Sequence, residues 1–469
     1  MSRMNLRNLA IALFLSLFSI HNLSAENGYT IKVKIKNTKD TVCYLGYPYG
    51  DKKYVQDTAK ISNGNMFTFH KNDTLQEGIY FIYTPNNIYF EIIGDNQDIS
   101  IETDTTDLIK NLKVEGSPQT KIFRDFQLFM RENQLNASEL NSKMKSDKAN
   151  EEKYREELIQ IDKNVKSYRS NLIQEHSDLF VSKLIKSTIE INVPESPKDA
   201  SGKETDPNFR FNYYRQHYFD NIDFSEPAML RTPVFAQKIN EYLDKLTYKH
   251  PDSIIKSAHF IIEKARANED VFRYCVVSIS NKYETSNIMG MDAVFVDLAE
   301  SYYLTGQAHW ADKELIEKIA KRVQELKPLI GDKAPNIIAL DTNENVIPLY
   351  SLENEYVVLY FYDPDCGHCK KKTPELQQLY ESKLLDMGVE VYAASTNTDV
   401  EKWKEFINKF NLTFINVADP YTQSNFRADY YIDHTPKVFI LDSDKNIIAK
   451  KLDVEQIEEF LTKQQELQQ

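Results

Sequence analysis

The first part of the chain alternates between apolar and polar positions. The stretch YTIKVKIK at residues 29–36 places an apolar side chain at every second position, a period that indicates a half-buried strand. The runs IYFIYT and IYFEII flank Asn86-Asn87, and Asn63-Gly64 stands between two other such runs, as turn residues do in β-hairpins. The pattern predicts an all-β, sandwich-like domain over residues 26–116.

The spacing of apolar residues changes at Ser117-Pro118, a pair typical of the N-cap and first position of a helix. Beyond it, apolar side chains recur at alternating spacings of four and three, at Tyr154, Leu158, Ile161, Val165, Tyr168 and Leu172. This seam is too short for a true coiled coil, so it favours an intramolecular helix hairpin over a dimer zipper. Residues 192–208 are polar and rich in turn formers, which predicts an exposed loop. We expect an all-α domain over residues 117–328.

Residues 329–469 alternate between strand and helix patterns. The buried-strand runs are YVVLYFY, VEVYAAST, FINVAD, KVFIL and IIAKKL. Helices are predicted between them, and capping-box spacing marks two starts, at Thr398 with Glu401 and at Asp453 with Gln456. Such alternation predicts a layered α/β domain. The whole chain is therefore expected to be multidomain, with an all-β, an all-α and an α/β part.

Composition fits a large soluble protein, and its first residues indicate export. The 469 residues carry a net charge of −13, suit roughly three domains and do not favour nucleic-acid binding. Arg3 and Arg7 precede the apolar run LAIALFLSLFSI and a small residue, Ala25. The run is too short to span a membrane, so residues 1–25 are predicted to be a cleavable signal peptide, with an uncleaved anchor as the alternative. We expect the periplasm or cell envelope.

The four cysteines fall into two kinds. Cys43, in a strand pattern, and Cys275, in an apolar helical pattern, are predicted to be buried structural thiols. Cys366 and Cys369 form Cys-Gly-His-Cys, which outside the cytosol indicates a redox pair. A zinc site needs two more ligands at suitable spacing, which the sequence lacks, and a structural disulfide would close a very short loop. We expect no metal, and no cofactor besides the Cys366–Cys369 disulfide.

The predicted helix beginning at Cys366 suggests different roles for the two thiols. A cysteine at a helix N-terminus faces free N–H groups and the positive end of the helix dipole, which favours the thiolate. Lys370, Lys371 and Lys372 add positive charge in the next turn. Cys366 is thus the predicted nucleophile, and Cys369 the thiol that resolves the mixed disulfide. His368 can carry a proton near neutral pH and is a candidate for tuning the pair.

Residues 331–469 resemble the thioredoxin superfamily, and within it the exported TlpA/ResA-like thiol-disulfide oxidoreductases. The resemblance rests on the leader GDKAPNIIALDTNENVIPLYSL, on CGHC, on Pro374 in the following helix, and on His434-Thr435-Pro436 at the start of a strand. It implies a thioredoxin fold and a cis-proline loop, with Thr435 and Pro436 presenting backbone to an extended substrate. The preceding regions resemble uncharacterised β and helical modules of Gram-negative envelope proteins.

Three departures from the family pattern concern the redox site. Asp365 replaces the usual Trp before the first cysteine and opposes its thiolate. Tyr360 stands where thioredoxins carry a buried acid. CGHC is the motif of protein disulfide isomerases, so Gly367, His368 and Asp365 are the expected tuning residues, and the direction of electron flow stays open.

The resemblance favours a reductase that takes part in envelope redox homeostasis or antioxidant defence. Its expected partners are disulfide-bearing envelope proteins and a membrane thiol-electron donor. The alternatives are an oxidase or isomerase, and a partner-binding protein with an accessory thioredoxin domain. A peroxidase is disfavoured, because Leu359 and Asp363 occupy the positions where peroxiredoxins need Pro and Thr.

Overall fold

The computed structural model describes residues 28–62 and 64–468 and divides at Tyr242/Leu243 into two compact units. The predicted signal peptide lies outside these residues. Within the described part of the chain, no helix has the length and apolar character needed to cross a membrane. The division falls inside the region predicted to be all-α.

The first unit begins with two four-stranded sheets that face one another. One has the order β4-β1-β7-β8, formed by Met66–Lys71, Tyr29–Lys36, Asp98–Asp104 and Lys113–Glu115. The other has the order β3-β2-β5-β6, formed by Lys52–Lys60, Val42–Tyr49, Ile79–Tyr83 and Tyr89–Ile93. Apolar side chains from both sheets, Cys43 among them, share one core. The all-β prediction is confirmed, and alternate residues of β1, β4 and β7 are buried as their sequence pattern indicated.

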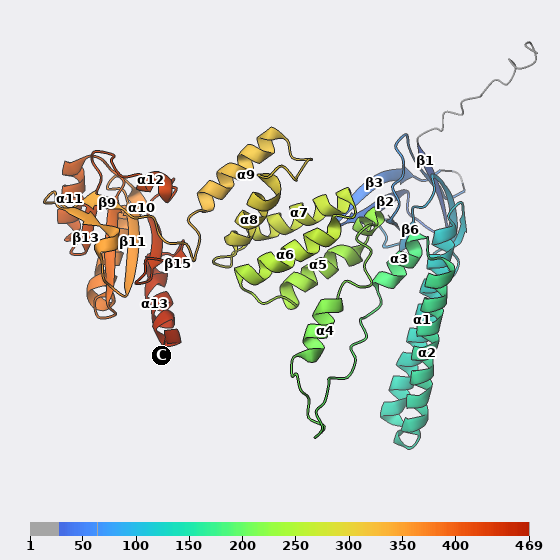
Figure 1. Ribbon diagram of the computed structural model, residues 1–469. Coiled ribbons are helices and arrows are strands. Elements are labelled where there is room, and N and C mark those ends of the chain that lie inside the picture. Colours follow the sequence, from blue (N-terminus) through green and yellow to red (C-terminus); the bar gives the residue numbers. More distant parts are fainter. Residues whose placement is uncertain (1–27, 63, 469) are drawn as a thin grey trace, which may run out of the picture. The chain divides into compact units, whose positions relative to one another are not determined.

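A long helix hairpin follows the sheets in the first unit (Figure 1). Helix α1 spans Pro118–Ser146, and its N-cap Ser117 accepts a hydrogen bond from the Thr120 N–H, as predicted. Helix α2 spans Glu151–Glu175 and packs along α1, with Tyr168 stacked on Phe129 at 4.0 Å between ring centres. Two shorter helices follow, α3 (Phe180–Ser187) and α4 (Phe209–His217), and the division between the units falls within the next one, α5 (Pro233–Lys245). The predicted hairpin is confirmed.

The second unit contains further helices and then the α/β domain. The helices are α6 (Pro251–Ala265), α7 (Glu269–Glu284), α8 (Asp292–Leu298), which continues into a π-helical turn at Ala299–Tyr303, and α9 (Lys313–Leu326). Cys275 of α7 is fully buried, as predicted. The central helical region of the fold-class prediction is therefore present.

The α/β domain is built on a seven-stranded mixed sheet with the order β10-β9-β13-β12-β11-β14-β15. The strands are β9 (Ile338–Leu340), β10 (Val346–Pro348), β11 (Tyr356–Tyr362), β12 (Val389–Ser395), β13 (Ile415–Ala418), β14 (Lys437–Leu441) and β15 (Ile447–Lys450). The helices are α10 (Gly367–Leu379), α11 (Val400–Phe410), α12 (Phe426–Asp429) and α13 (Val454–Gln468). Strands β11, β12 and β13 run parallel, whereas β14 is antiparallel to β11.

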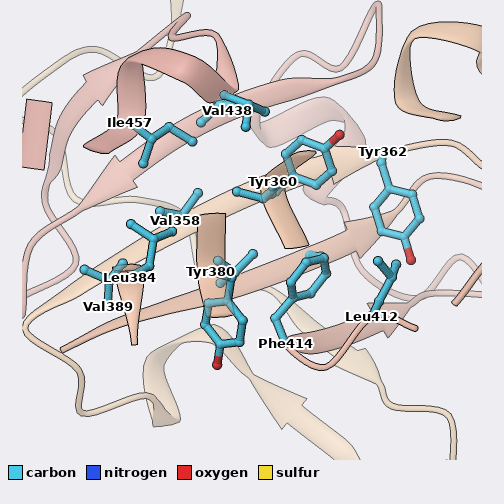
Figure 2. Close-up of a cluster of buried hydrophobic side chains, with 14 of the residues drawn as sticks. Val358, Tyr360, Tyr362, Tyr380, Leu384, Val389, Leu412, Phe414, Val438 and Ile457 are labelled. Carbon is cyan, nitrogen blue, oxygen red and sulfur yellow. The ribbon is translucent and has the colours of Figure 1, made fainter. Parts of the chain in front are cut away.

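Central strand β11 is buried on both faces, which explains its unbroken apolar sequence. Alternate side chains of β11, Val358, Tyr360 and Tyr362 among them, pack with α10, α11 and α13, and Figure 2 shows these three in one cluster. The others, such as Leu359 and Phe361, pack with α12 and the leader segment on the opposite face. The sheet is thus covered on both faces, and its central strand β11 is packed on both sides.

A buried cation joins the end of the helical region to this sheet within the second unit. Lys450 of β15 is 5% exposed, and its ammonium group lies 2.9 Å from the carboxylate of Asp292, which is 13% exposed. The same group donates to the carbonyl oxygens of Leu326 at 2.6 Å and Pro328 at 3.1 Å. Because these contacts reach two separate segments, Lys450 ties α8 and the end of α9 to β15.

Candidate active site

Cys366 lies between the end of β11 and the start of α10. The turn Asp363-Pro364-Asp365 follows β11, and the Cys366 N–H donates to the carbonyl of Asp363 at 3.1 Å. Cys366 is itself the N-cap of α10, and its Sγ accepts the N–H of Cys369 at 3.5 Å. The sulfur therefore occupies the place of a capping oxygen, next to N–H groups that the helix leaves unpaired.

The two thiols of the motif, both free in this structure, have opposite environments. Cys366 is partly exposed, whereas Cys369 is fully buried. Burial raises the pKa of Cys369 to about 12, although the N–H of Asp363, 3.5 Å from its Sγ, acts in the opposite sense. Burial also acts on Cys366, but hydrogen bonds from Cys369 and Thr435 outweigh it and lower the pKa of Cys366. At neutral pH, Cys366 is thus by far the better source of a thiolate.

The loop before β14 brings a distant segment to this sulfur. The Thr435–Pro436 peptide bond is cis. The Sγ of Cys366 lies 3.2 Å from the carbonyl oxygen of Thr435, although 69 residues separate them in the chain. Because β14 pairs directly with β11, the loop at its start reaches the end of β11 where Cys366 begins the helix. The structure therefore unites Cys366, Cys369, Thr435 and Pro436.

Cys369 shares a buried cluster with tyrosine side chains that form hydrogen bonds to other buried polar groups. The hydroxyl of Tyr360 is 3.0 Å from that of Thr373, and both side chains are fully buried. The Tyr362 hydroxyl donates to Asn416 at 3.1 Å and accepts from Trp403 at 2.9 Å. Burial raises the pKa of Tyr360 strongly. The group at the position of the superfamily's buried acid is thus a neutral phenol, which cannot take the proton of Cys369 at neutral pH.

Two of the predicted tuning residues, Gly367 and His368, are exposed. His368 lies on the first turn of α10, and its backbone N–H also helps to lower the pKa of Cys366. A Cβ added at Gly367 would meet no atom within 4 Å, so packing does not require glycine there. Lys372 of the same helix pairs with Glu375 at 3.0 Å and with Glu455. Part of the positive charge expected in this turn is therefore neutralised.

Asp365 has partners that the sequence analysis did not identify. Its carboxylate lies 3.0 Å from the ammonium group of Lys402 on α11 and accepts from the side-chain amide of Asn397 at 3.2 Å. The hydrogen bond from Lys402 is the main reason that the pKa of Asp365 is lowered. Capping-box spacing already placed a helix start near residue 398, but no sequence signal directs Lys402 toward Asp365. The acid beside the nucleophile is therefore paired.

The remaining cysteines take no part in the site. Cys43 and Cys275 are both fully buried, and burial raises the pKa of Cys43 to about 12 and that of Cys275 further. Among residues 28–62 and 64–468, no group of three or more His, Cys, Asp or Glu side chains is arranged to hold a metal ion. The two thiols that the site brings together are Cys366 and Cys369, and such a pair can carry out thiol-disulfide exchange.

Fold and site together define a thioredoxin-like domain with a redox-active dithiol. Residues 330–450 match the AhpC/TSA family, and residues 29–123 and 174–326 match two domains of unknown function, DUF4369 and DUF5106. Thiol-disulfide oxidoreductase ResA of Bacillus cereus is 28% identical over 160 residues, which cover 34% of this chain and 84% of the relative. The C-terminal domain is of the ResA/TlpA-like kind, and the chain is a thiol-disulfide oxidoreductase.

Solved structures give further similarities. A domain of a possible thiol-disulfide isomerase from Cytophaga hutchinsonii is 34% identical and covers 29% of this chain and 94% of its own, with a TM-score of 0.28. A thioredoxin-like protein from Bacteroides caccae is 19% identical and covers 59% of this chain and 99% of its own, with a TM-score of 0.41.

Proposed function

We propose that this protein is an exported reductase of disulfides in other envelope proteins, with Cys366 as the attacking thiol and Cys369 as the resolving thiol. The observation that carries the proposal is the contrast between the two sulfurs. Cys366 is accessible at a helix N-terminus and has a lowered pKa, whereas Cys369 is fully buried and has a pKa of about 12. Only one of the two can reach the disulfide of a folded partner.

The reaction takes place in two exchanges. The Cys366 thiolate attacks one sulfur of the substrate disulfide, forms a mixed disulfide and releases the other substrate sulfur as a thiolate, which takes a proton from water. Cys369 then loses its proton and attacks the Cys366 sulfur, which forms the Cys366–Cys369 disulfide and releases the second substrate thiolate. Two electrons pass to the substrate, and a dithiol donor at the membrane must restore them.

The loop at Thr435 and Pro436 is the proposed binding site for an extended segment of the substrate protein. The carbonyl of Thr435 already lies 3.2 Å from the nucleophilic sulfur, so a strand that paired with this backbone would bring its own cysteine within reach. The basic and apolar start of the chain supports export. The similarity to ResA, a thiol-disulfide oxidoreductase, supports thiol-disulfide exchange rather than a peroxidase role.

Trapping tests the assignment of the two thiols. Cys369→Ser keeps the attacking sulfur and removes the resolving one, so mixed disulfides with envelope proteins should accumulate and disappear on reduction. Cys366→Ser should trap nothing, and Cys275→Ser, which alters a buried thiol far along the chain from the motif, should behave like the wild type. Accumulation in Cys366→Ser but not in Cys369→Ser would show that the two roles are reversed.

The reduction potential of the Cys366–Cys369 pair tests the direction of electron flow. A glutathione titration of the wild type should give a potential nearer to the thioredoxin value of about −270 mV than to the isomerase value of about −180 mV. The exposed imidazole of His368 between the cysteines is the observation that favours the isomerase alternative. A potential near −180 mV would therefore replace the reductase proposal with an oxidase or isomerase.

A further inference from the structure

The carboxylate of Asp365 lies next to the nucleophilic Cys366 in the chain. A carboxylate next to Cys366 in the chain disfavours a second negative charge on that sulfur. Asp365 is 59% exposed and ionised, since its pKa is lowered. The pKa of Cys366 is nevertheless lowered as well. Hydrogen bonds to the Cys366 sulfur account for that lowering, and the partners of Asp365 decide how strongly its charge opposes them.

Lys402 and Asn397 both bind one oxygen of that carboxylate. The Oδ2 of Asp365 lies 3.0 Å from the Lys402 ammonium and 3.2 Å from the Asn397 amide nitrogen. The same amide nitrogen donates to Asp363 Oδ1 at 3.2 Å, and the Asp365 N–H donates to that oxygen at 2.8 Å. Both acids of the turn are thereby held to the segment that leads into α11.

This pair is poorly suited to stabilising the fold. Lys402 is 52% exposed, and solvent-exposed ion pairs contribute about 0–1 kcal/mol to stability. Its partner Asp365 directly precedes Cys366 in the chain, which gives the pair a different consequence. The reduced protein carries a thiolate on Cys366, whereas the disulfide carries no charge there, so a nearby cation stabilises the reduced form alone.

We propose that Lys402 is a positioning residue of the redox site, which holds and neutralises the Asp365 carboxylate so that the Cys366 thiolate can persist. The proposal deepens the function proposed above and rests on it for its biological meaning. In balanced form, the disulfide takes up two electrons and one proton to give the Cys366 thiolate and the Cys369 thiol. Loss of the Lys402 charge disfavours that product.

Four variants test the proposal through the thiolate absorbance of Cys366 and the glutathione equilibrium. Lys402→Met should raise the pKa of Cys366 and lower the equilibrium constant for reduction about threefold, which is about 14 mV toward more negative potential. Asp365→Asn should shift both quantities the opposite way. The double variant, which removes both charges, should return close to the wild type, and Lys402→Arg should retain the wild-type values.

Lys404→Met is the matched control, because it removes the same charge from another side of α11. A shift in Lys402→Met no larger than in Lys404→Met would overturn the proposal. So would a double variant that stays as far from the wild type as Lys402→Met alone. In about 1 M salt, where screening acts within about 3 Å, the Lys402→Met shift should shrink.

These measurements report on the cysteine pair alone and need no protein substrate. If Cys369→Ser traps no envelope protein while the charge variants behave as expected, the proposed function fails and the role of Lys402 stands. If trapping succeeds but the double variant does not return toward the wild type, the proposed function stands and the role of Lys402 fails. The two proposals can therefore fail separately.

Discussion

Alkylation should separate the motif cysteines by a margin that follows from their environments. With a pKa of about 12, Cys369 is a thiolate in only about one molecule in 10⁵ at pH 7. A thiol at the ordinary value of about 8.5 is a thiolate in about three molecules in 10² at pH 7, and the pKa of Cys366 is lowered from its ordinary value by hydrogen bonds to its sulfur. The ratio of thiolate populations is therefore about 10³ or more in favour of Cys366.

Intrinsic nucleophilicity reduces this margin without reversing it. A thiolate of higher pKa is the stronger nucleophile, with a Brønsted coefficient of about 0.4–0.5. This offsets part of the difference in thiolate population and still leaves Cys366 faster than Cys369 by more than about tenfold. The complete burial of Cys369 and Cys43 adds to the difference. We expect one reactive cysteine in the folded, reduced protein at neutral pH.

The assay is limiting iodoacetamide on the reduced protein, followed by peptide mass mapping at a series of pH values. Labelling of Cys366 should rise with pH and level off above its pKa, whereas labelling of Cys369 should still be rising at pH 10. Cys366→Ser should lose the fast reaction. Labelling of Cys43 or Cys275 at the rate of Cys366, or equal rates for Cys366 and Cys369, would refute the reasoning.

Two further substitutions test the site and the fold. His368→Pro removes a ring that can carry charge and a backbone N–H directed at Cys366, so the thiol pKa should rise and the potential should become more negative by some tens of millivolts, where about 30 mV is 1.4 kcal/mol. His368→Ala keeps the N–H and should shift less; an unchanged potential in both variants would mean that His368 does not tune the pair. Lys450→Met leaves Asp292 buried without its 2.9 Å partner and should cost about 3–5 kcal/mol in urea unfolding. Lys451→Met, which removes a 57% exposed lysine 3.7 Å from the same carboxylate, should cost less than about 1 kcal/mol; equal costs would contradict a special role for the buried lysine.

Local patterns predicted the elements around the site well. The run YVVLYFY is strand β11, and KVFIL is strand β14, with the same bounds. Helix α10 begins one residue after Cys366, because a turn with proline and two aspartates separates it from β11. Such features depend on a few neighbouring residues, whose preferences agree with the final fold.

The predicted start of helix α11 was wrong by one residue. The capping-box pattern predicted Thr398 as the cap of α11, but the N-cap is Asp399, whose side chain accepts the N–H of Lys402. Both residue types cap helices well. Asn397, whose oxygen accepts the Asp399 N–H at 2.9 Å, takes part in holding the turn, so contacts outside the helix help to select Asp399. In contrast, Gln456 does reach back to the Asp453 N–H, as its spacing predicted.

The nature of the site could be derived from residues close together in the chain, but its electrostatics could not. Cys366 and Cys369 are one helical turn apart, so their spacing and the predicted helix start suffice to distinguish an exposed sulfur from a buried one. Thr435 and Lys402 are 69 and 37 residues from their partners, and only the pairing of β14 with β11 and the placement of α11 bring them there. Sequence periodicity tells which face of an element is apolar, but not which polar side chain of another element it will meet. The charge next to the nucleophile is therefore decided by tertiary structure, because Coulomb interactions depend on distances in space.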